Sequence, residues 1–419
     1  MDADTNGDSV ENLRDLRLSS LDDDEDGEEE FVVDSDDDYD EDGDKEKKEE
    51  PVTLGFVEKP KNHWSLLRQF FPNKAGGIPA WLDPVNLPSQ NSSLCDFCGE
   101  PLQFLLQVYA PPMLEKESAY HRTLFVFMCP SMSCLFRDQH EQWRRPPEKP
   151  SRSVKVFRCQ LPRSNTFYSS EDPNDDGTAK SSGAGAPLCN WCGTWKGGKV
   201  CSSCKRAHYC SQKHQVMHWR SGHKIECQQL NTISQSFDSN PCNGDIILTE
   251  VQKVASNTLW PEYEITYDDD SEYQTKMSEE VGHANSLISK DRMCDTTNSI
   301  LGNFEGDDEK KSMASFQEHI AKAPEQVLRY PRNVKTTPLW PMSSGRPSKA
   351  DIPKCSYCSG PLRFEFQILP QLLYYFGVKN DVDSLDWATI AVFTCEASCE
   401  TSVSYIEEFT WVQLYSTSA

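Results

Sequence analysis

The sequence predicts a mainly β protein with few helices, built from two duplicated zinc-ribbon-like β half-domains packed as a pseudo-symmetric pair. Three observations predict this fold: paired cysteines recur in both halves of the chain, a dense cysteine and histidine cluster lies between them, and the first 50 residues are strongly acidic. We therefore expect five regions. They are a disordered acidic tail (1–50), an N-terminal half (54–162), an inserted zinc module (189–227), a mostly flexible linker (228–311) and a C-terminal half (312–419).

The duplication is predicted by segments that recur in the same order. The segment CDFCGEPLQFLLQV, which begins at Cys95, matches CSYCSGPLRFEFQI, which begins at Cys355. Farther along, TLFVFMC from Thr123 matches TIAVFTC from Thr389, and a Pro-x-Trp triplet precedes each first segment. Duplication explains three matched blocks in one order far better than chance does.

Apolar and partly alternating runs predict the strands of these halves. In the N-terminal half they cover Pro101–Tyr109, Thr123–Cys129 and Ser153–Leu161. A further short strand is predicted over Pro261–Tyr267, and a helix over Ser315–Ala323.

A groove is expected where the two halves meet, with open sheet edges that could accept an added strand from a partner. Three tryptophans are candidates to line it: Trp81, Trp340 and Trp411. The alternative is that these side chains simply pack in the core.

Each half carries a C-x2-C pair before one strand and a second cysteine pair after another, a pattern typical of four-cysteine zinc sites. The two predicted ligand sets are Cys95, Cys98, Cys129 and Cys134, and Cys355, Cys358, Cys395 and Cys399. Pairing between the halves instead of within each, and buried free thiols, remain alternatives. The three cysteines without a partner pattern are expected to be ordinary thiols: Cys159, Cys242 and Cys294.

The central module holds eight metal-type ligands within 39 residues, spaced C-x2-C, C-x2-C, C-x3-H and H-x3-C. A two-residue gap lets two sulfurs on one turn reach the same ion, and a three-residue gap does so on one helix face. Four such pairs predict two tetrahedral zinc sites. The run Ser211–His218 is expected to be a helix with Ser211 as its N-cap, ended by Gly222. His208 and His218 are left over; each is expected to be a surface or packing residue, and the alternative is a ligand of a third site.

The module resembles the MYND zinc finger, whose ligand pairs interleave. The resemblance implies that zinc one takes Cys189, Cys192, Cys210 and His214, and that zinc two takes Cys201, Cys204, His223 and Cys227. His214 stands where many of these fingers have cysteine, and a neutral imidazole also binds zinc. The same resemblance makes Gln215 and Trp219 candidate contacts for Pro-rich peptides, although Trp219 could equally belong to the core of the finger.

Charge is concentrated at the start of the chain. Residues 1–50 carry 24 acidic and 5 basic residues, a net charge of −19 out of −24 for the whole chain. Such a segment buries too little apolar surface to fold alone, and it would shield a basic partner from RNA. A short leucine cluster (Leu13, Leu16, Leu18 and Leu21) could dock as an amphipathic turn or act as an export-type signal, or be a stray apolar cluster.

Compartment and reaction class are limited by what the sequence lacks. It has no apolar run of 18 residues and no secretory n- and h-regions, so we expect no membrane span and no secretion. Unsecreted paired cysteines are typical of metal ligands in a reducing compartment, so a cytoplasmic location is expected, with shuttling to the nucleus left open. No catalytic motif occurs and all ligand sets fill four positions, so an enzyme is not expected. Direct nucleic-acid binding is not expected either, because the finger is only modestly basic.

The chain as a whole resembles the programmed cell death protein 2 family. The resemblance rests on LGF (Leu54–Phe56), GGIPAWLDP, CDFCGEPLQFLLQVYAP, the finger, PEQVLRY, PLW and CSYCSGPLRFEFQ, and covers roughly 54–228 and 260–415. It implies a dedicated chaperone that captures a basic small-subunit (40S) ribosomal protein during ribosome biogenesis. The alternative is an adaptor that acts through its MYND finger in transcription, cell proliferation or cell death regulation.

Overall fold

The computed structural model describes eleven stretches of the chain. They are residues 52–88, 91–112, 116–144, 151–171, 183–237, 254–255, 259–269, 308–331, 336–379, 381 and 383–415. The acidic tail, the leucine cluster, Cys242, Cys294 and most of the predicted linker lie outside these residues.

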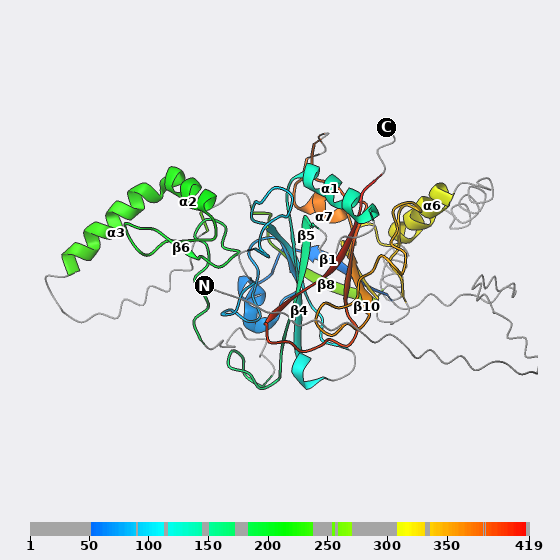
Figure 1. The fold of residues 1–419 in the computed structure, drawn as a ribbon, viewed down its shortest axis with the longest axis horizontal. Helices are drawn as coiled ribbons and strands as arrows, with labels where there is room; N and C mark the ends of the chain where they lie inside the picture. The colour runs from blue at the N-terminus through cyan, green and yellow to red at the C-terminus, as the bar shows by residue number, and fades with distance from the viewer. Residues whose placement is uncertain are drawn as a thin grey trace, which may run out of the picture. The chain divides into compact units, whose positions relative to one another are not determined.

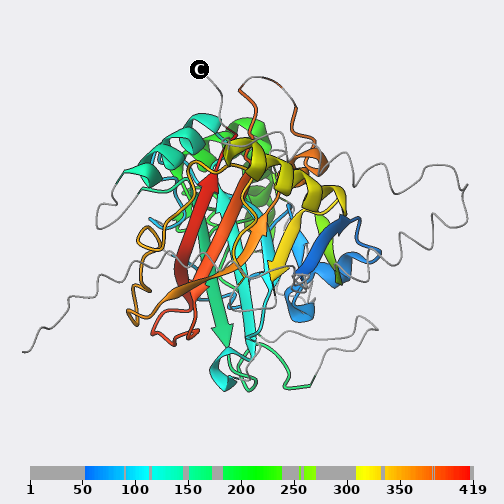
Figure 2. The ribbon, with the colours of Figure 1, turned by 90° about the vertical axis from the view of Figure 1, so that its right-hand side faces the viewer.

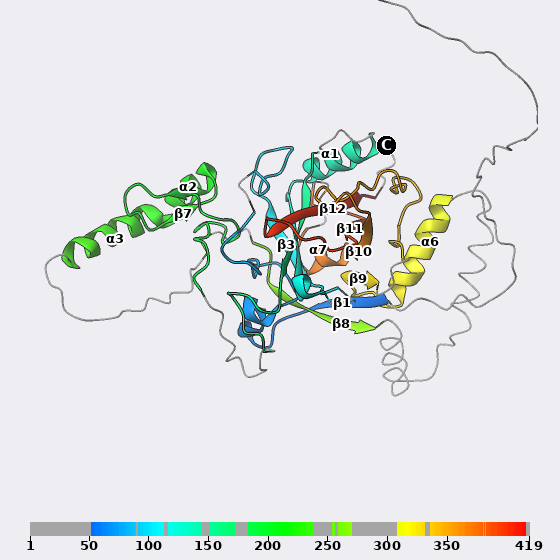
Figure 3. The same cartoon turned by 60° about the horizontal axis from the view of Figure 1, so that its bottom comes forward.

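Ten described strands form one closed β-barrel, in the order β1-β8-β2-β3-β4-β5-β12-β11-β10-β9 (Figures 1 and 3). Their bounds are β1 Val52–Glu58, β2 Lys74–Ala75, β3 Gln103–Tyr109, β4 His121–Met128, β5 Val154–Leu161, β8 Tyr263–Asp269, β9 Leu328–Pro331, β10 Leu362–Ile368, β11 Thr389–Cys395 and β12 Tyr405–Gln413. The strands predicted near 101–109, 123–129, 153–161 and 261–267 all form.

Strands from the two halves of the sequence pair directly with one another. β5 pairs antiparallel with β12, with Cys159 opposite Tyr405, and β1 pairs antiparallel with β9, with Gly55 opposite Leu328. Figure 2 shows β12, β11, β10, β9 and β1 side by side, in colours that run from red to blue. The expected pair of separately packed half-domains is therefore not confirmed, because both halves contribute strands to a single barrel.

The closed barrel also removes the expected open sheet edges. A closed sheet leaves no free edge between the halves among the described strands, so the predicted open edges for an added strand were wrong. Trp81 is 4% exposed and Trp411 is 2% exposed, while Trp340 is partly buried and packs against the cluster around Phe393 and Trp411. All three tryptophans thus contribute to packed clusters, as the alternative held.

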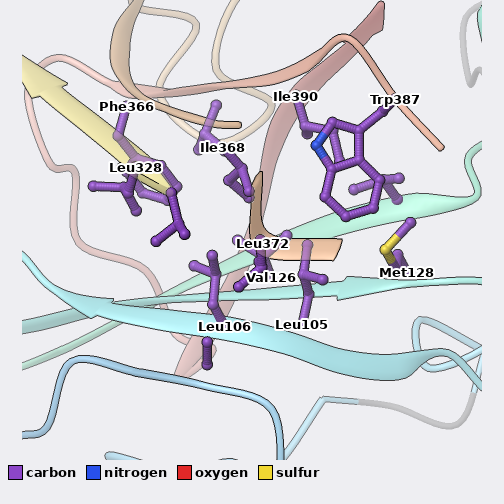
Figure 4. Packing of buried hydrophobic residues seen from close by; sticks show 14 of the residues in the cluster. Leu105, Leu106, Val126, Met128, Leu328, Phe366, Ile368, Leu372, Trp387 and Ile390 are labelled. Carbon is purple, nitrogen blue, oxygen red and sulfur yellow. The ribbon is translucent and has the colours of Figure 1, made fainter. Parts of the chain in front are cut away.

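The barrel interior is an apolar core to which both halves contribute. Leu106, Val126 and Met128 come from the N-terminal strands, and Leu328 and Phe366 come from the C-terminal strands (Figure 4). Burying these side chains supplies the main stabilising free energy, at roughly 25 cal/mol per Å² of apolar surface. The halves therefore stabilise each other and share one core.

The central residue of the LGF segment, Gly55, lies too close to its neighbours for a side chain. A Cβ atom at this position would lie 3.0 Å from Leu328 Cβ and 3.2 Å from Ile265 Cγ2, on the two strands that flank β1. A larger residue would push β8 and β9 away from β1, so glycine permits the close approach that closes the barrel here.

Helices accompany the barrel, and one of them packs Leu372 and Leu373 into the apolar core. They are η1 His63–Leu66, η2 Arg68–Phe70, η3 Glu117–Ala119, α1 Met132–Trp143, α6 Asp308–Ala321 and α7 Gln371–Tyr375, besides those of the finger described below. The helix predicted over Ser315–Ala323 forms as α6 but begins earlier. No helix in the described parts of the chain is long and apolar enough to span a membrane.

Helix α1 was not predicted from the sequence. Its side chains bind backbone groups at the ends of two strands. The side-chain amide of Gln142 donates to Val412 O and accepts from Val412 N, while the carboxylate of Asp138 accepts from Ser153 N. β5 and β12 no longer pair with each other at Val412 and Ser153. The bonds from α1 therefore satisfy the backbone groups of these two residues.

The two strand pairs that contain the recurring segments share details. β3–β4 has a register shift between Phe104 and Leu106, and β10–β11 has one between Phe364 and Phe366. In both pairs a glutamine, Gln107 or Gln367, uses its side-chain amide to bind the backbone near the Pro-x-Trp triplet. The recurring sequence therefore produces the same local irregularity twice.

Candidate metal centres

The structure brings the four predicted ligand sets together. In each set the four ligand atoms lie within 4.8 Å of one another. The sets are Cys95, Cys98, Cys129 and Cys134; Cys189, Cys192, Cys210 and His214; Cys201, Cys204, His223 and Cys227; and Cys355, Cys358, Cys395 and Cys399. The cysteines of the two outer sets meet within each half, so pairing between the halves does not occur.

Most separations within the sets fit tetrahedral zinc, while the Sγ of Cys210 lies closer to Nδ1 of His214, at 3.1 Å. Zinc–sulfur bonds of about 2.3 Å at tetrahedral angles place two sulfurs about 3.8 Å apart, and a sulfur and a histidine nitrogen about 3.6 Å apart. Four observed Sγ–Sγ separations are 3.7 Å (Cys98–Cys129), 3.9 Å (Cys192–Cys210), 3.8 Å (Cys201–Cys227) and 3.6 Å (Cys355–Cys399). The Sγ of Cys189 is 3.6 Å from Nδ1 of His214, and the Sγ of Cys204 is 3.6 Å from Nε2 of His223. The residues present therefore fit the metal.

The four C-x2-C pairs share one local structure that explains their spacing. In each, the first cysteine N–H donates to a carbonyl five or six residues ahead, and the residue four positions ahead donates back to the cysteine carbonyl. That fourth residue always has a positive φ: Gly99 (71°), Gly193 (65°), Lys205 (58°) and Ser359 (58°). The resulting tight turn points both sulfurs to one side, and glycine is favoured there because it adopts this conformation without strain.

Local hydrogen bonds also favour the thiolate form at some of these cysteines. The side-chain hydrogen bond from Cys129 lowers the pKa of Cys95 to about 5, although burial opposes the shift. The backbone N–H of Gly360, 3.4 Å from the Sγ of Cys358, lowers the pKa of that thiol to about 7. The hydrogen bond between Cys95 and Cys129 raises the pKa of Cys129 in turn, so it favours the thiolate at one member of the pair.

The finger consists of β6 (Lys199–Val200), β7 (His208–Tyr209), α2 (Gln212–His218), a π-helical turn η4 (Trp219–His223) and α3 (Lys224–Phe237). Ser211 caps α2 as predicted, since its Oγ accepts from the N–H of His214 at 3.1 Å. Gly222 was expected to end the helix. Instead it lies in η4 with non-helical angles, and helical structure resumes as α3.

The π-turn aligns side chains that an α-helix would separate. His218 and His223 are five residues apart, yet their rings stack with centroids 4.7 Å apart. The Nδ1 of His218 lies 3.1 Å from the hydroxyl of Tyr209, and Glu226 Oε2 lies 3.5 Å from Nδ1 of His223. His218 is 6% exposed, so it is the packing residue expected, beside the second ligand set. His208 is half-buried and its N–H donates to Asn190 Oδ1.

The finger is packed against the barrel through tryptophans, which the sequence reasoning did not predict. Trp195 is 1% exposed, packs between Trp81 and Phe127, and donates from Nε1 to Leu102 O at 2.7 Å. Trp81 in turn donates to Thr194 O at 2.9 Å. The signal for this contact in the sequence was Trp195 in the GTWKGG segment, a large apolar residue that the zinc sites do not need.

We expect Trp195→Ala to destabilise the protein by about 3–5 kcal/mol, because it removes a large buried side chain and leaves a cavity. The free energy of unfolding from denaturant titration measures this. Trp219→Ala is the matched control in the same finger: Trp219 is 41% exposed, so we expect a change below about 1 kcal/mol. Equal losses would show that Trp195 does not anchor the finger.

The predicted peptide contacts lie on the surface of the finger. Gln215 is half-buried, Trp219 is 41% exposed and its neighbour Val216 is 39% exposed. This exposure favours a contact role for Trp219 over a place in the finger core. Peptide binding itself stays a prediction.

Each of the four sets supplies four ligands, which is the arrangement of structural zinc sites; catalytic sites keep one position open. We expect Cys98→Ser to lower the zinc content of the purified full chain by one ion. Cys159→Ala should leave it unchanged, because Cys159 is buried outside every described ligand set. Elemental analysis of both variants measures this, and equal zinc contents would contradict the assignment at Cys98.

Comparison with known proteins matches most of the chain. Family models match at residues 51–175 (programmed cell death protein 2, N-terminal domain), 310–414 (its C-terminal putative domain) and 189–227 (MYND finger). Programmed cell death protein 2 of Bos taurus is 35% identical over 370 residues, which cover 87% of this chain and 96% of the relative. The chain belongs to the programmed cell death protein 2 family. The Rattus norvegicus protein is 36% identical over 87% of this chain and 97% of its own length.

More distant relatives match over a similar share of the chain. Programmed cell death protein 2-like of Homo sapiens is 27% identical over 84% of this chain and 92% of its own length. No solved structure matched the chain. A MYND finger binds zinc, so zinc is the metal of the finger. The outer cysteine sets could bind metal as well, and four ions per chain remains a prediction. The matched families are non-enzymatic domains of an adaptor type.

Proposed function

We propose that this protein is a zinc-binding chaperone or adaptor that captures one basic ribosomal protein of the small (40S) subunit and acts in ribosome biogenesis. The observation that carries the proposal is the match of both halves and the finger to the programmed cell death protein 2 family, for which such a role is expected. The closed four-ligand sets support a binding function over a catalytic one.

The charge distribution supports a basic client. Residues 1–50 hold −19 of the net charge of −24. A diffuse negative charge of this size attracts a basic protein over about one Debye length, roughly 8–10 Å at physiological salt, and competes with RNA for it. The proposed place of action is the cytoplasm, with shuttling to the nucleus.

The test is affinity purification of the full chain from growing cells, with nuclease treatment and low salt, followed by mass spectrometry. One near-stoichiometric 40S protein, without mature subunits, is the expected result. A variant with the acids of residues 22–44 changed to Asn and Gln should lose the client at lower salt than a variant with the same residues shuffled. Recovery of no ribosomal protein at any salt would contradict the proposal.

A second candidate function is favoured by the exposed Trp219 and Val216 on the finger. In this case the protein is an adaptor whose MYND finger binds Pro-rich peptides in transcription, cell proliferation or cell death regulation. Trp219→Ala separates the two, because it should abolish binding to a Pro-rich peptide array without changing capture of a ribosomal client.

We also infer that the two halves arose by duplication of one zinc-ribbon-like unit. The shared register shifts, glutamine contacts and cysteine turns support this inference. Neither proposed function depends on it.

A further inference from the structure

The seam between β5 and β12 is held by few backbone pairs. Only Val156–Cys159 pairs with Tyr405–Glu408, whereas β4 and β5 pair over eight positions. Beyond Glu408, the hydroxyl of Thr410 donates to Val154 O, and the side chain of Gln142 on α1 accepts from Val412 N. Side chains near the paired segment therefore contribute much of what joins the halves at this seam.

Three side chains of the N-terminal half hold the loop between Cys395 and Cys399, which carries two of the C-terminal zinc ligands. Lys116 Nζ donates to Ala397 O and Ser398 O, both at 2.9 Å. Gln160 Nε2 donates to Ser398 O at 3.2 Å. Arg158 Nη1 donates to Cys399 O at 3.1 Å. Three successive carbonyls of the loop are thus bound from across the seam.

Arg158 also contacts the ligand atom itself and ties it to the paired segment. Its Nη2 lies 3.7 Å from the Sγ of Cys399, and its Nε donates to Glu408. The other oxygen of Glu408 accepts from the N–H of Cys395 at 3.0 Å. One buried network therefore joins β5, β12 and both ends of the ligand loop.

The corresponding loop of the N-terminal site is bound differently. Cys129 N donates to Ser153 O, and Cys134 lies in the first turn of α1, so both contacts stay within the N-terminal half. The two four-cysteine sites thus have the same ligand types and local turns. The loop of the C-terminal site is itself bound across the seam, whereas the N-terminal site is linked to β12 through the far end of α1.

The metal would give these cross-seam bonds their strength. Zinc bound by four thiolates has a net charge of −2, which the cations of Arg158 and Lys116 offset. The loop also contains Ser398 at a φ of 43°, a conformation that a non-glycine residue keeps only when its surroundings hold it. Loss of the metal would remove the link between Cys395 and Cys399 that constrains this loop.

We propose that the C-terminal four-cysteine site is a metal-dependent clasp for the barrel. With zinc bound, it holds the β5–β12 seam closed through Lys116, Arg158 and Gln160, and release of this zinc loosens the seam between the halves. The N-terminal site reaches the seam at a different place, where α1 binds Val412 and Leu414 of the C-terminal half. This inference does not depend on the identity of the client.

Coupling of this kind is reciprocal, so weakening the clasp must weaken zinc binding. In the zinc-loaded full chain, Lys116→Met should accelerate chelator-driven alkylation of Cys355, Cys358, Cys395 and Cys399 by about 10-fold or more, read for each cysteine by mass spectrometry. The rates at the N-terminal set should not change. Lys354→Met is the matched control: it removes the same charge beside Cys355, but Lys354 is exposed and is not among the side chains that donate to Ala397, Ser398 and Cys399.

A second experiment measures the seam directly by hydrogen exchange. Cys399→Ser should raise exchange about 10-fold in the paired segments 156–159 and 405–408, whereas Cys134→Ser should raise it in α1 and at Val412, which α1 binds, and leave 405–408 protected. Equal alkylation rates in Lys116→Met and Lys354→Met would overturn the proposal. So would unchanged exchange of both strands in Cys399→Ser, and the lysine pair remains decisive if a cysteine variant does not fold.

Discussion

Chelation of zinc is expected to unfold the finger completely, with loss of hydrogen-exchange protection over Gln212–His218 and of the packing around Trp195. Structural zinc contributes about 10–16 kcal/mol to small zinc-finger modules, more than the whole stability of an ordinary domain. The 39-residue finger has only a small apolar cluster of its own, so it has no comparable substitute for the metal.

His214→Ala and His208→Ala separate ligand from non-ligand histidines in this finger. The first removes a predicted ligand and should unfold α2 at all zinc concentrations that load the wild type. The second removes a half-buried side chain that belongs to no ligand set in the described residues, and should leave α2 protected. Protection of α2 in the chelated wild type would contradict the expected dependence on zinc.

Glu365→Gln is expected to cost about 3–5 kcal/mol of stability, because it leaves the buried cation of Arg122 without its partner. Arg122 is 1% exposed and Glu365 is 3% exposed, and the guanidinium binds both carboxylate oxygens at 2.8 and 3.0 Å. Tyr330 also donates to Glu365, at 2.8 Å. The pair joins β4 of one half to β10 of the other, so its loss should loosen the whole barrel.

Two controls locate this effect. Replacing both partners by methionine should recover most of the lost stability, since no charge is then left buried. Glu100→Gln breaks the exposed Lys213–Glu100 pair and should cost only about 0–1 kcal/mol. A loss in Glu365→Gln no larger than in Glu100→Gln would contradict the role assigned to the buried pair.

The same carboxylate makes a defined contribution to the pH dependence of stability. Burial alone would raise the pKa of Glu365, but Arg122 and its hydrogen bonds outweigh burial and lower the pKa from 4.5 to about 2. A lowered pKa means that the contribution is fully present above pH 4.5 and is lost as pH falls toward 2. The stability difference between wild type and Glu365→Gln should therefore shrink over that range, with the metal content of both kept equal.

Ligands and strands could be predicted from the sequence because they depend on local spacing. The C-x2-C turns need only a positive φ four residues after the first cysteine, and the alternating runs around β3, β4 and β5 have a period that belongs to strands. The cap at Ser211 likewise depends on residues three positions apart.

The barrel could not be predicted in the same way, because its closure depends on partners far apart in the sequence. Arg122 meets Glu365 and Arg158 meets Glu408 across about 240 positions, and nothing near either residue marks its partner. One signal was present. Arg122, Arg158 and Glu365 each lie within a strand that also carries several large apolar residues, where a buried charge implies a counter-charge. Trp195 could similarly have been noticed as a large apolar residue that the zinc sites do not need.

Native mass spectrometry of the full chain, purified from growing cells at low salt after nuclease treatment, tests the central claim most directly. A zinc-stapled chaperone predicts a complex whose mass equals one chain, four zinc ions and one 40S ribosomal protein. A chain that carries its zinc but no ribosomal protein, or only Pro-rich partners, would contradict the chaperone function and favour the adaptor.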